Sequence, residues 1–351
     1  MKILKRVIKK IARITLRPFL TRIRRFFFDD VHFQFDKINN KIDSIGSKIE
    51  SLERNIAKIK ENQFNLYQIG DEEFNSRQRV VESNIGLMIL PTHSDNTISP
   101  TIISTGEWEP LESMLVRNLL REGDFVIDIG ANFGWYSLLM AEIVGDNGIV
   151  IALEPEQENF EILRKNVLLQ KKPHIIKTLN MAAHSSDDES VLIKSPENKG
   201  DHRVFMGDND ADEDVYDEGN WDTQKIKTIK LDSLIKQLPK RLYRDLNYEL
   251  KNPIRLIKMD TQGAEYHIFK GAEKTLELTE YVITELWPYG LRRQKTDPKK
   301  FINKIAEHFD SFQIISGEDA DLDTTYPIME AENLAEQLKG IFHTDLFLFN
   351  K

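Results

Sequence analysis

The feature that most constrains the fold is an apolar stretch that ends in a glycine-containing turn and leads into a second apolar stretch. Residues 125–129 carry four apolar side chains and follow a charged segment, a pattern typical of a buried parallel strand. Gly130 and Gly134 lie in the turn, and residues 135–144 resemble a helix in composition. Gly130 allows a sharp backbone turn, and Gly134 allows a ligand or a helix to approach closely. This strand, turn and helix predict the entry unit of a nucleotide-binding α/β fold.

The spacing of the two glycines indicates which kind of ligand the turn can bind. Asp128, Gly130 and Gly134 form the pattern Asp-x-Gly-x-x-x-Gly, which lacks the middle glycine that a dinucleotide pyrophosphate needs for close backbone contact. Glu154 follows Gly134 by 20 residues, at the end of the apolar segment 148–153, where an acid can hold both hydroxyls of a ribose. The two features together favour S-adenosylmethionine (SAM), with the turn at its amino-acid part. An NAD-dependent enzyme is the alternative function. If this region binds no ligand, the glycines only form a tight turn between the strand and the helix, and Glu154 is a solvated side chain.

Composition limits the class of protein. The chain has 351 residues, 40% of them hydrophobic, which is enough for a sizeable core. It has no cysteine, so disulfides and thiol chemistry are excluded. Neither an apolar run of transmembrane length nor a signal peptide is recognisable in the sequence. We therefore expect a cytoplasmic protein.

The first 28 residues differ sharply in charge from the rest. They contain ten Lys or Arg and no Asp or Glu, which leaves 38 basic and 57 acidic residues in the remaining chain. Their apolar and basic side chains fall on opposite arcs of a helix until Pro18 interrupts it. This pattern is typical of an interfacial helix attracted to an anionic membrane, here at the inner face. A partner-binding helix, a nucleic-acid arm and a transit peptide are the alternatives, and the acidic remainder predicts no nucleic-acid partner.

A second N-terminal module, residues 29–69, has the pattern of a coiled coil. Apolar residues recur at alternating spacings of three and four over more than four heptads. Isoleucine dominates both the a and the d positions, which favours a homo-oligomer, a trimer or tetramer rather than a dimer. A single amphipathic helix packed on the following domain is the alternative. Residues 70–351 then form the predicted catalytic domain.

From residue 111 onward, helical and strand-like segments alternate. We expect helices over 111–120, 135–144, 156–170, 264–278 and 298–309, and a further helix beginning at residue 231. We expect strands over 125–129, 148–153, 175–180, 190–194, 225–230, 254–259, 281–286, 312–315 and 345–349, and a loop in the acidic segment 207–222. The segment 77–91 is expected to cover the domain. The alternation predicts a mostly parallel sheet with helices on both faces.

Several ordered motifs give the chain a family resemblance. They lie at 106–110, 126–134, 154–155, 231–234, 258–265 and 271–272. In this order and at these separations they are similar to the FkbM family of SAM-dependent methyltransferases, over about residues 86–351. The resemblance implies a class I methyltransferase fold, Rossmann-like and mostly parallel with a terminal antiparallel strand. It also implies O-methylation of a sugar or another hydroxylated metabolite. The family often has Glu where Gln262 stands here.

The resemblance also implies which residues hold the cofactor. The cofactor turn matches Asp128, Gly130, Asn132 and Gly134, and the ribose acid matches Glu154. Glu109 matches the acid that precedes the first strand and is expected near the cofactor ammonium. Asn180 and Ala182, at the end of the third strand, are expected near the adenine.

Three acids and a histidine are the candidates for catalysis. Asp260 follows the apolar segment 254–259, Glu265 lies five residues on, and Glu285 ends the next strand. The carboxyl ends of parallel strands border the ligand crevice of such sheets, so these acids are expected to position the acceptor or to act as a base. His202 lies in a polar segment similar to one that faces the acceptor in the family, and a histidine can remove the proton of a hydroxyl at neutral pH. Strand-end, helix-capping and surface roles are the alternatives. We predict no metal site, because no histidine accompanies the acids at close spacing.

The sequence therefore predicts a SAM-dependent O-methyltransferase that acts on a sugar hydroxyl of a polysaccharide or glycolipid, held at a membrane surface as an oligomer. The alternative is a protein without catalytic activity, namely a coiled-coil scaffold whose methyltransferase domain is degenerate.

Overall fold

The computed structural model describes residues 77–93, 95–196, 198–204, 221–238, 254–317 and 320–350. All of them belong to one compact unit, Asn75–Lys351. The basic helix predicted over 1–28, the coiled coil predicted over 29–69 and most of the acidic loop at 207–222 lie outside the described residues. These three interpretations therefore stay predictions.

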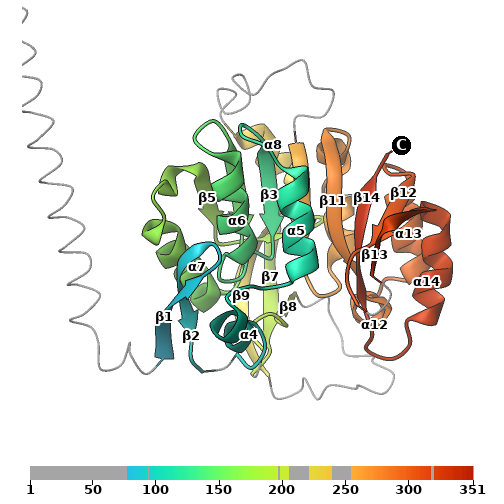
Figure 1. Cartoon of the computed structure of the whole chain (residues 1–351). Coiled ribbons are helices and arrows are strands. Elements are labelled where there is room, and N and C mark those ends of the chain that lie inside the picture. The colour runs from blue at the N-terminus through green and yellow to red at the C-terminus, as the bar shows by residue number, and fades with distance from the viewer. Residues whose placement is uncertain are drawn as a thin grey trace, which may run out of the picture. The chain divides into compact units, whose positions relative to one another are not determined.

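An eight-stranded sheet forms the centre of this unit (Figure 1), in the order β13-β12-β14-β11-β10-β3-β4-β5. Five strands pair in parallel, and the other three pair antiparallel, with β14 between β11 and β12. This is the predicted class I methyltransferase topology, which is confirmed. The parallel strands are β3 (Phe125–Ile129), β4 (Ile149–Leu153), β5 (Ile176–Leu179), β10 (Ile254–Met259) and β11 (Thr279–Leu286). The others are β12 (Ser311–Ile314), β13 (Asp321–Pro327) and β14 (Thr344–Phe349).

Helices cover both faces of this sheet, as predicted; α5 and α6 lie in front of β3 and α8 lies behind it in Figure 1. The helix at the glycine turn has the predicted bounds. The helices are α4 (Ile98–Thr105), α5 (Pro110–Leu119), α6 (Trp135–Val144), α7 (Gln157–Leu169), α8 (Leu231–Gln237), α10 (Glu265–Lys270), α11 (Glu273–Leu276), α12 (Pro288–Arg293), α13 (Pro298–Ala306) and α14 (Ala331–Gln337), with short 3-10 turns at Pro173–Ile175 and Ile328–Glu330. Among the described helices, none is long and apolar enough to cross a bilayer.

The prediction of one helix over 264–278 is wrong. The segment forms two short helices, α10 and α11, and the chain turns between them at Gly271. A Cβ atom at Gly271 would lie 2.0 Å from the carbonyl oxygen of His184. The close approach of these two backbone segments, which sequence composition does not reveal, thus divides the helix.

Two smaller sheets accompany the central one. The segment predicted only as a cover forms a hairpin of β1 (Gln78–Ser83) and β2 (Gly86–Pro91). The strands predicted at 190–194 and 225–230 pair antiparallel in a separate four-stranded sheet, in the order β6-β9-β7-β8. Its members are β6 (Ala182–Ala183), β7 (Asp188–Lys194), β8 (Arg203–Val204) and β9 (Asp222–Ile229).

The two faces of the central sheet differ in polarity. Successive side chains of a strand point to opposite faces, and residues in register on neighbouring strands share a face. On β3, Ile127 and Ile129 enter the main apolar cluster with α8, α10 and α13. Asp128 points to the other face, where it is in register with Lys258 of β10. Glu285 of β11 is in register with Asp345 of β14, so buried charged groups gather at this end of the sheet.

Candidate functional site

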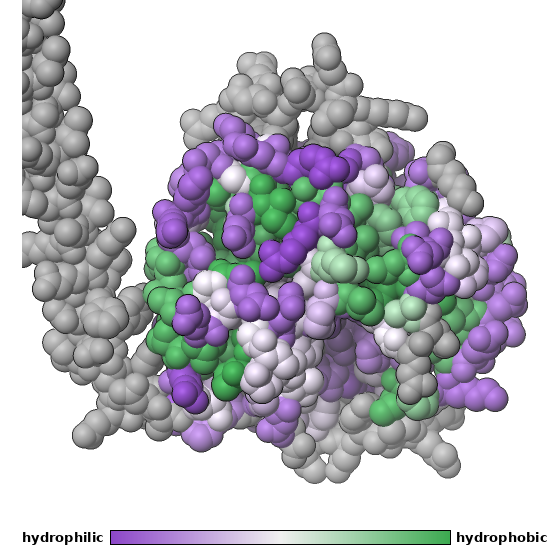
Figure 2. All heavy atoms as spheres, in the orientation of Figure 1, coloured by the Kyte–Doolittle hydropathy of each residue, from purple (hydrophilic) through white to green (hydrophobic). Residues whose placement is uncertain are grey.

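A cavity of about 310 Å³ lies at the carboxyl ends of β3, β4, β10 and β11. Residues of α4, of the β3–α6 turn, of the loop at 198–202 and of the segment 258–264 line it, with Glu154, Glu285, His343 and Asp345. Figure 2 shows a recess in the surface between the positions that α4 and α12 occupy in Figure 1. The cavity therefore lies where ligands bind in open α/β sheets.

The β3–α6 turn forms one wall of the cavity. Gly130, Asn132 and Gly134 all have positive φ angles, of 79°, 51° and 97°. A Cβ atom on Gly130 would lie 2.0 Å from the carbonyl oxygen of Asp260, so the turn packs directly against the segment after β10. A Cβ atom on Gly134 would meet Leu163 Cδ1 at 2.6 Å. Gly134 thus admits helix α7 rather than a ligand, one of the two possibilities that the sequence left open.

Glu154 is buried where β4 ends, and both of its oxygens accept hydrogen bonds from backbone amides. Oε2 accepts from the amide of Asn132 at 2.8 Å, and Oε1 accepts from the amide of Glu156 at 2.8 Å. Burial raises the pKa of Glu154 to about 8, although these amides oppose the rise. Each carboxylate oxygen has two acceptor sites, so Glu154 can still accept from the hydroxyls of a ribose.

Of the two residues predicted near the adenine, Ala182 lines the cavity and Asn180 does not. The Asn180 amide donates to the carbonyl oxygens of Glu154 and Pro155 at 3.0 and 3.1 Å. It thereby fixes the chain beside Glu154, while the cavity is lined by Met181 and Ala182.

Glu109 and Asp128 are buried at the α5–α6 side of the cavity. Glu109 precedes α5 with a φ of 44°, and its Oε2 accepts from the Tyr136 hydroxyl at 2.8 Å. Asp128 accepts from the Ser137 hydroxyl at 2.5 Å. Burial raises the pKa of Glu109 to about 8 and raises that of Asp128 as well. Both acids thus face a cavity in which a positive ligand charge is favourable.

Lys258 is a site residue that the sequence analysis missed. It is 5% exposed, its Nζ lies 4.3 Å from the centroid of the Tyr136 ring, and the same atom is 3.6 Å from Asp260 Oδ2. Burial opposes its charge, but the surrounding acids, led by Asp260 and Glu109, hold its pKa above the usual range. A lysine two positions before Asp260 on a strand shares its face, and this was the signal in the sequence.

Asp260 and Glu265, both predicted as catalytic, have unlike surroundings. Asp260 borders the cavity, and its Oδ1 accepts from the Gln262 amide at 2.9 Å. Glu265 is fully buried outside the cavity lining, and its Oε1 accepts from the Thr261 amide and hydroxyl and from the Gly263 amide. Burial raises the pKa of Glu265 to about 7. Its contacts hold the loop between β10 and α10, which makes it a positioning residue for Asp260.

Glu285 also borders the cavity, together with Asp345, which the sequence analysis did not select. Glu285 Oε1 lies 3.6 Å from His343 Nε2, whereas its buried Oε2 has no hydrogen-bond partner. Burial and the neighbouring acids Asp260, Glu265 and Asp345 raise the pKa of Glu285 well above its usual value. Carboxyl groups therefore crowd this end of the cavity, and their mutual proximity favours the neutral form of Glu285.

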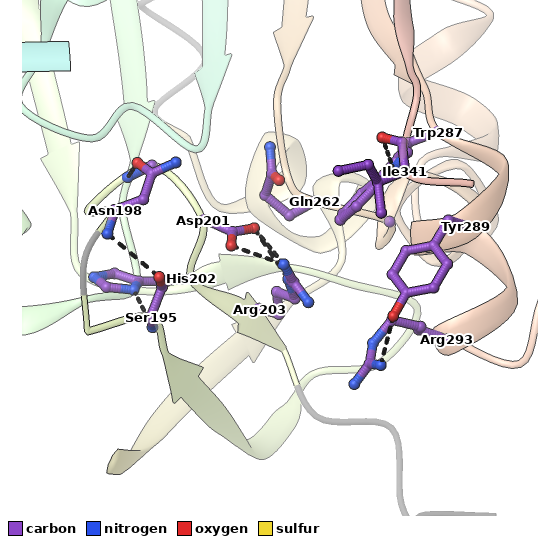
Figure 3. A network of polar contacts seen from close by, with 12 residues as sticks. Ser195, Asn198, Asp201, His202, Arg203, Gln262, Trp287, Tyr289, Arg293 and Ile341 are labelled. Carbon is purple, nitrogen blue, oxygen red and sulfur yellow. Dashed lines mark hydrogen bonds and ion pairs between the residues drawn. The ribbon is translucent and has the colours of Figure 1, made fainter. Parts of the chain in front are cut away.

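His202 borders the cavity in the loop after β7 (Figure 3), where its Nδ1 accepts from the Ser195 amide at 3.0 Å. Burial lowers its pKa to about 4, so the ring is neutral at pH 7. Because Nδ1 accepts, the proton of the neutral ring is on Nε2, and this buried atom has no partner. This geometry suits a hydrogen-bond donor and argues against the predicted role of a base. His184, in contrast, stacks on His267 at 5.2 Å and is absent from the cavity lining.

The same loop is tied to the rest of the site. The Asn132 and Asn159 amides both donate to the carbonyl oxygen of Lys199, at 3.2 and 3.0 Å. Arg203 donates to both Asp201 oxygens at 2.6 and 2.7 Å, and its guanidinium lies 5.1 Å from the ring of Trp287 (Figure 3). The loop is thus fixed over the cavity by contacts on both sides.

Metal-ligand spacing occurs at one place in the part of the chain that the structure describes. Glu273, Glu307 and His308 have ligand atoms within 4.8 Å of one another. They lie away from the cavity lining, and Lys304 already donates to Glu273 and Glu307.

Comparison with known proteins assigns the family. The sequence model of the Methyltransferase FkbM domain matches residues 128–312, more than half of the chain. The chain belongs to the FkbM methyltransferase family. The match confirms the family resemblance, and the protein is a methyltransferase whose cofactor is S-adenosylmethionine.

Two characterised relatives are similar to this FkbM protein over about half of its length. The methyltransferase sdnD of Sordaria araneosa is 28% identical over 185 residues, 50% of this chain and 71% of that protein. The hexuronic acid methyltransferase AglP of Haloferax volcanii is 26% identical over 200 residues, 56% of this chain and 68% of that protein. A crystal structure of an FkbM methyltransferase from Methylobacillus flagellatus aligns with a TM-score of 0.38 at 15% identity, covering 66% of this chain and 45% of that one.

Proposed function

We propose that this FkbM-family protein transfers a methyl group from SAM to a hydroxyl group of a sugar. The observation that carries the proposal is the arrangement of one cavity, with Glu154 at the end of β4 and Asp260 and Glu285 at the ends of β10 and β11. A ribose-binding acid and a group of acids that can act on a hydroxyl thus border the same space. The relative AglP is named for the methylation of hexuronic acid, which supports a sugar as the class of acceptor.

The buried polar atoms around the cavity fit a nucleoside-containing cofactor. Asn132 Oδ1, Asn159 Oδ1 and His202 Nε2 are buried, lack hydrogen-bond partners and belong to residues that line the cavity. Two acceptors and one donor without partners are costly unless a ligand satisfies them. We assign the ribose hydroxyls to Glu154 and the cofactor ammonium to Glu109 and Asp128, with Asn132 beside them and Ala182 near the adenine. Gly130, Gly134 and Asn180 keep these residues in place.

The residues of β10 and β11 act on the acceptor. When bound, SAM supplies an electrophilic methyl group on a sulfonium. An alcohol is a weak nucleophile that loses its proton as the methyl group is transferred. Asp260 is suited to receive that proton, because it borders the cavity and its Oδ1 is fixed by the Gln262 side-chain amide. Orientation of the hydroxyl by the cavity supplies a further part of the rate.

The N-terminal modules complete the proposal. Residues 1–28 bind an anionic membrane surface, and residues 29–69 associate as a parallel trimer or tetramer that presents several basic helices together. The composition of these segments supports this, since a basic amphipathic helix binds anionic lipid and an Ile-rich heptad pattern favours more than two strands. The methylated sugar would then belong to a polysaccharide or glycolipid at that surface.

Calorimetry and a transfer assay test the proposal. We expect the full chain to bind SAM and not NAD, and to add one methyl group to a sugar, as detected by mass spectrometry. Glu154→Gln should weaken SAM binding about tenfold, because the amide nitrogen that replaces one carboxyl oxygen cannot accept a hydrogen bond, and a buried group left without its partner costs about 1–3 kcal/mol. Glu161→Gln, an exposed acid on α7, is the matched control. Binding of NAD instead of SAM, or of neither, would contradict the assignment.

A further inference from the structure

Glu285 has one side-chain oxygen that is buried at the cavity and lacks a partner. The side chain, near the end of β11, is 5% exposed and borders the cavity. Its Oε1 lies 3.6 Å from His343 Nε2, whereas its Oε2 is buried without a hydrogen-bond partner. A buried polar atom is costly unless a partner satisfies it. The proposed function places the acceptor at this end of the cavity, so the acceptor can supply the partner.

The charges around Glu285 determine whether this oxygen accepts or donates a hydrogen bond. The register between β11 and β14 places Asp345 beside it, and Asp260 follows the neighbouring strand β10. Glu265 is buried at the start of α10. The ammonium of Lys258 lies 3.6 Å from Asp260 Oδ2 and thus already matches one of these acids. A further negative charge in this partly desolvated group is unfavourable, because like charges repel strongly at low dielectric.

Glu285 is therefore a neutral carboxyl group in the folded protein. Burial and the neighbouring acids Asp260, Glu265 and Asp345 hold its pKa well above the usual value, and Lys258 opposes this rise only in part. A neutral carboxyl group has one O–H donor, which a carboxylate lacks. The oxygen without a partner, Oε2, can thus donate a hydrogen bond to an oxygen of a ligand.

We propose that Glu285 is a specificity residue whose Oε2 donates a hydrogen bond to the acceptor oxygen next to the hydroxyl that is methylated. Met259 pairs with Thr284, so the residues that follow them, Asp260 and Glu285, lie at the same level of neighbouring strands. Such strands lie about 4.8 Å apart, and the two carboxyl groups can therefore reach oxygens on adjacent carbons of one ring. Asp260 takes the proton of the reacting hydroxyl, and Glu285 holds the oxygen beside it. The substrate class is then a sugar with vicinal oxygens, an inference that rests on the proposed sugar O-methylation.

Urea unfolding tests the protonation of Glu285 without any acceptor. A carboxyl group that is neutral in the fold releases its proton on unfolding, so it stabilises the fold less as the pH rises above the ordinary pKa of a glutamate. Glu285→Gln cannot lose this proton. The ratio of the wild-type unfolding constant to that of Glu285→Gln should therefore rise about tenfold per pH unit between about pH 5.5 and 7.5. For Glu277→Gln, which changes an exposed acid away from the cavity, the same ratio should stay constant.

Deoxy sugars test the contact with the acceptor. Methyl glycosides of glucose, galactose and mannose are incubated with SAM and the full chain, transfer is measured by mass spectrometry, and the monodeoxy derivatives of the best acceptor follow. Loss of the hydroxyl beside the reacting one should lower the wild-type kcat/KM about tenfold, because Oε2 is left without a partner. This loss should disappear in Glu285→Leu, which has no donor. With the intact sugar, Glu285→Leu should be at least about tenfold slower than Glu285→Gln, whose amide nitrogen can donate from the same place. SAM calorimetry establishes that each variant is folded, and Glu285→Ala replaces Glu285→Leu if the latter does not bind SAM.

The outcomes separate this inference from the proposed function. A pH-independent ratio of unfolding constants for Glu285→Gln shows an ionised Glu285 and overturns the inference. The inference also fails if the wild type methylates every vicinal deoxy sugar as fast as the parent, or if the deoxy loss persists in Glu285→Leu. Sugar methylation stands in each of these cases. No transfer to any glycoside while SAM binds overturns the proposed function, and this inference with it.

Discussion

Replacing Lys258 by methionine isolates the electrostatics of the site. Lys258 is buried to 5% exposure, and its Nζ is 4.3 Å from the Tyr136 ring centroid and 3.6 Å from Asp260 Oδ2. Methionine keeps much of the length of the side chain and removes the ammonium group that faces Asp260, Glu109, Asp128 and Asp345. Removal of one partner from a buried charged pair typically costs about 3–5 kcal/mol.

The cost should depend on pH in a direction that the structure fixes. Burial already raises the pKa of Glu109 to about 8 with Lys258 in place. The folded variant can avoid the uncompensated charge by keeping one further carboxyl protonated, and that group then has a folded pKa above its unfolded value of about 4. A group with a raised folded pKa contributes stability that is present at low pH and is lost as the pH rises. One retained proton costs about 1.4 kcal/mol per pH unit above the unfolded pKa. The loss should therefore be about 5 kcal/mol near pH 8 and about 1–2 kcal/mol near pH 5.5.

Urea unfolding measured near pH 8 and near pH 5.5 tests the expected loss of stability. The four tryptophans, Trp108, Trp135, Trp221 and Trp287, all lie in the unit Asn75–Lys351, so intrinsic fluorescence reports on this unit alone. Lys225→Met, which removes an exposed lysine of β9, is the control and should change stability by less than about 0.5 kcal/mol. If Lys258→Met is as stable as the wild type near pH 8, or if its loss does not shrink at the lower pH, the reasoning is refuted.

Three further results are expected. Asp260→Asn should lower the turnover number more than tenfold while SAM affinity measured by calorimetry changes by less than threefold, since positioned proton acceptors contribute roughly 10²–10⁴-fold; equal losses in both would make Asp260 a cofactor ligand. Gly134→Ala should destabilise the unit by about 1–3 kcal/mol through overpacking against Leu163, and Leu163→Ala in the same chain should recover part of the loss if that contact is the cause. Deletion of residues 1–28 should abolish flotation with anionic vesicles and leave the oligomer intact by light scattering; a deleted protein that still floats, or a full-length monomer, contradicts the membrane-anchored oligomer.

Much of the fold could be read from local patterns. Strand β10 and helix α6 have the predicted bounds, because a continuous apolar run between polar residues and a glycine turn before a helix are signals within a few residues. The order of such elements was enough to predict the class I methyltransferase fold. The composition of residues 264–278, in contrast, suggested one helix, and the close backbone contact of Gly271 with His184 divides it.

The candidate site depended far more on tertiary structure. The sequence alone identified Glu154, Asp260 and Glu285. Each of these acids ends or follows an apolar strand, and the carboxyl ends of the parallel strands of a sheet lie along the edge where ligands bind. Lys258 and Asp345 were missed, since their roles arise from registers between strands far apart in the chain. The proton position on His202 likewise depends on one amide, that of Ser195. Local sequence determines which elements form, whereas the charges that surround a buried group are set by the packing of distant segments, and only the folded chain brings those together.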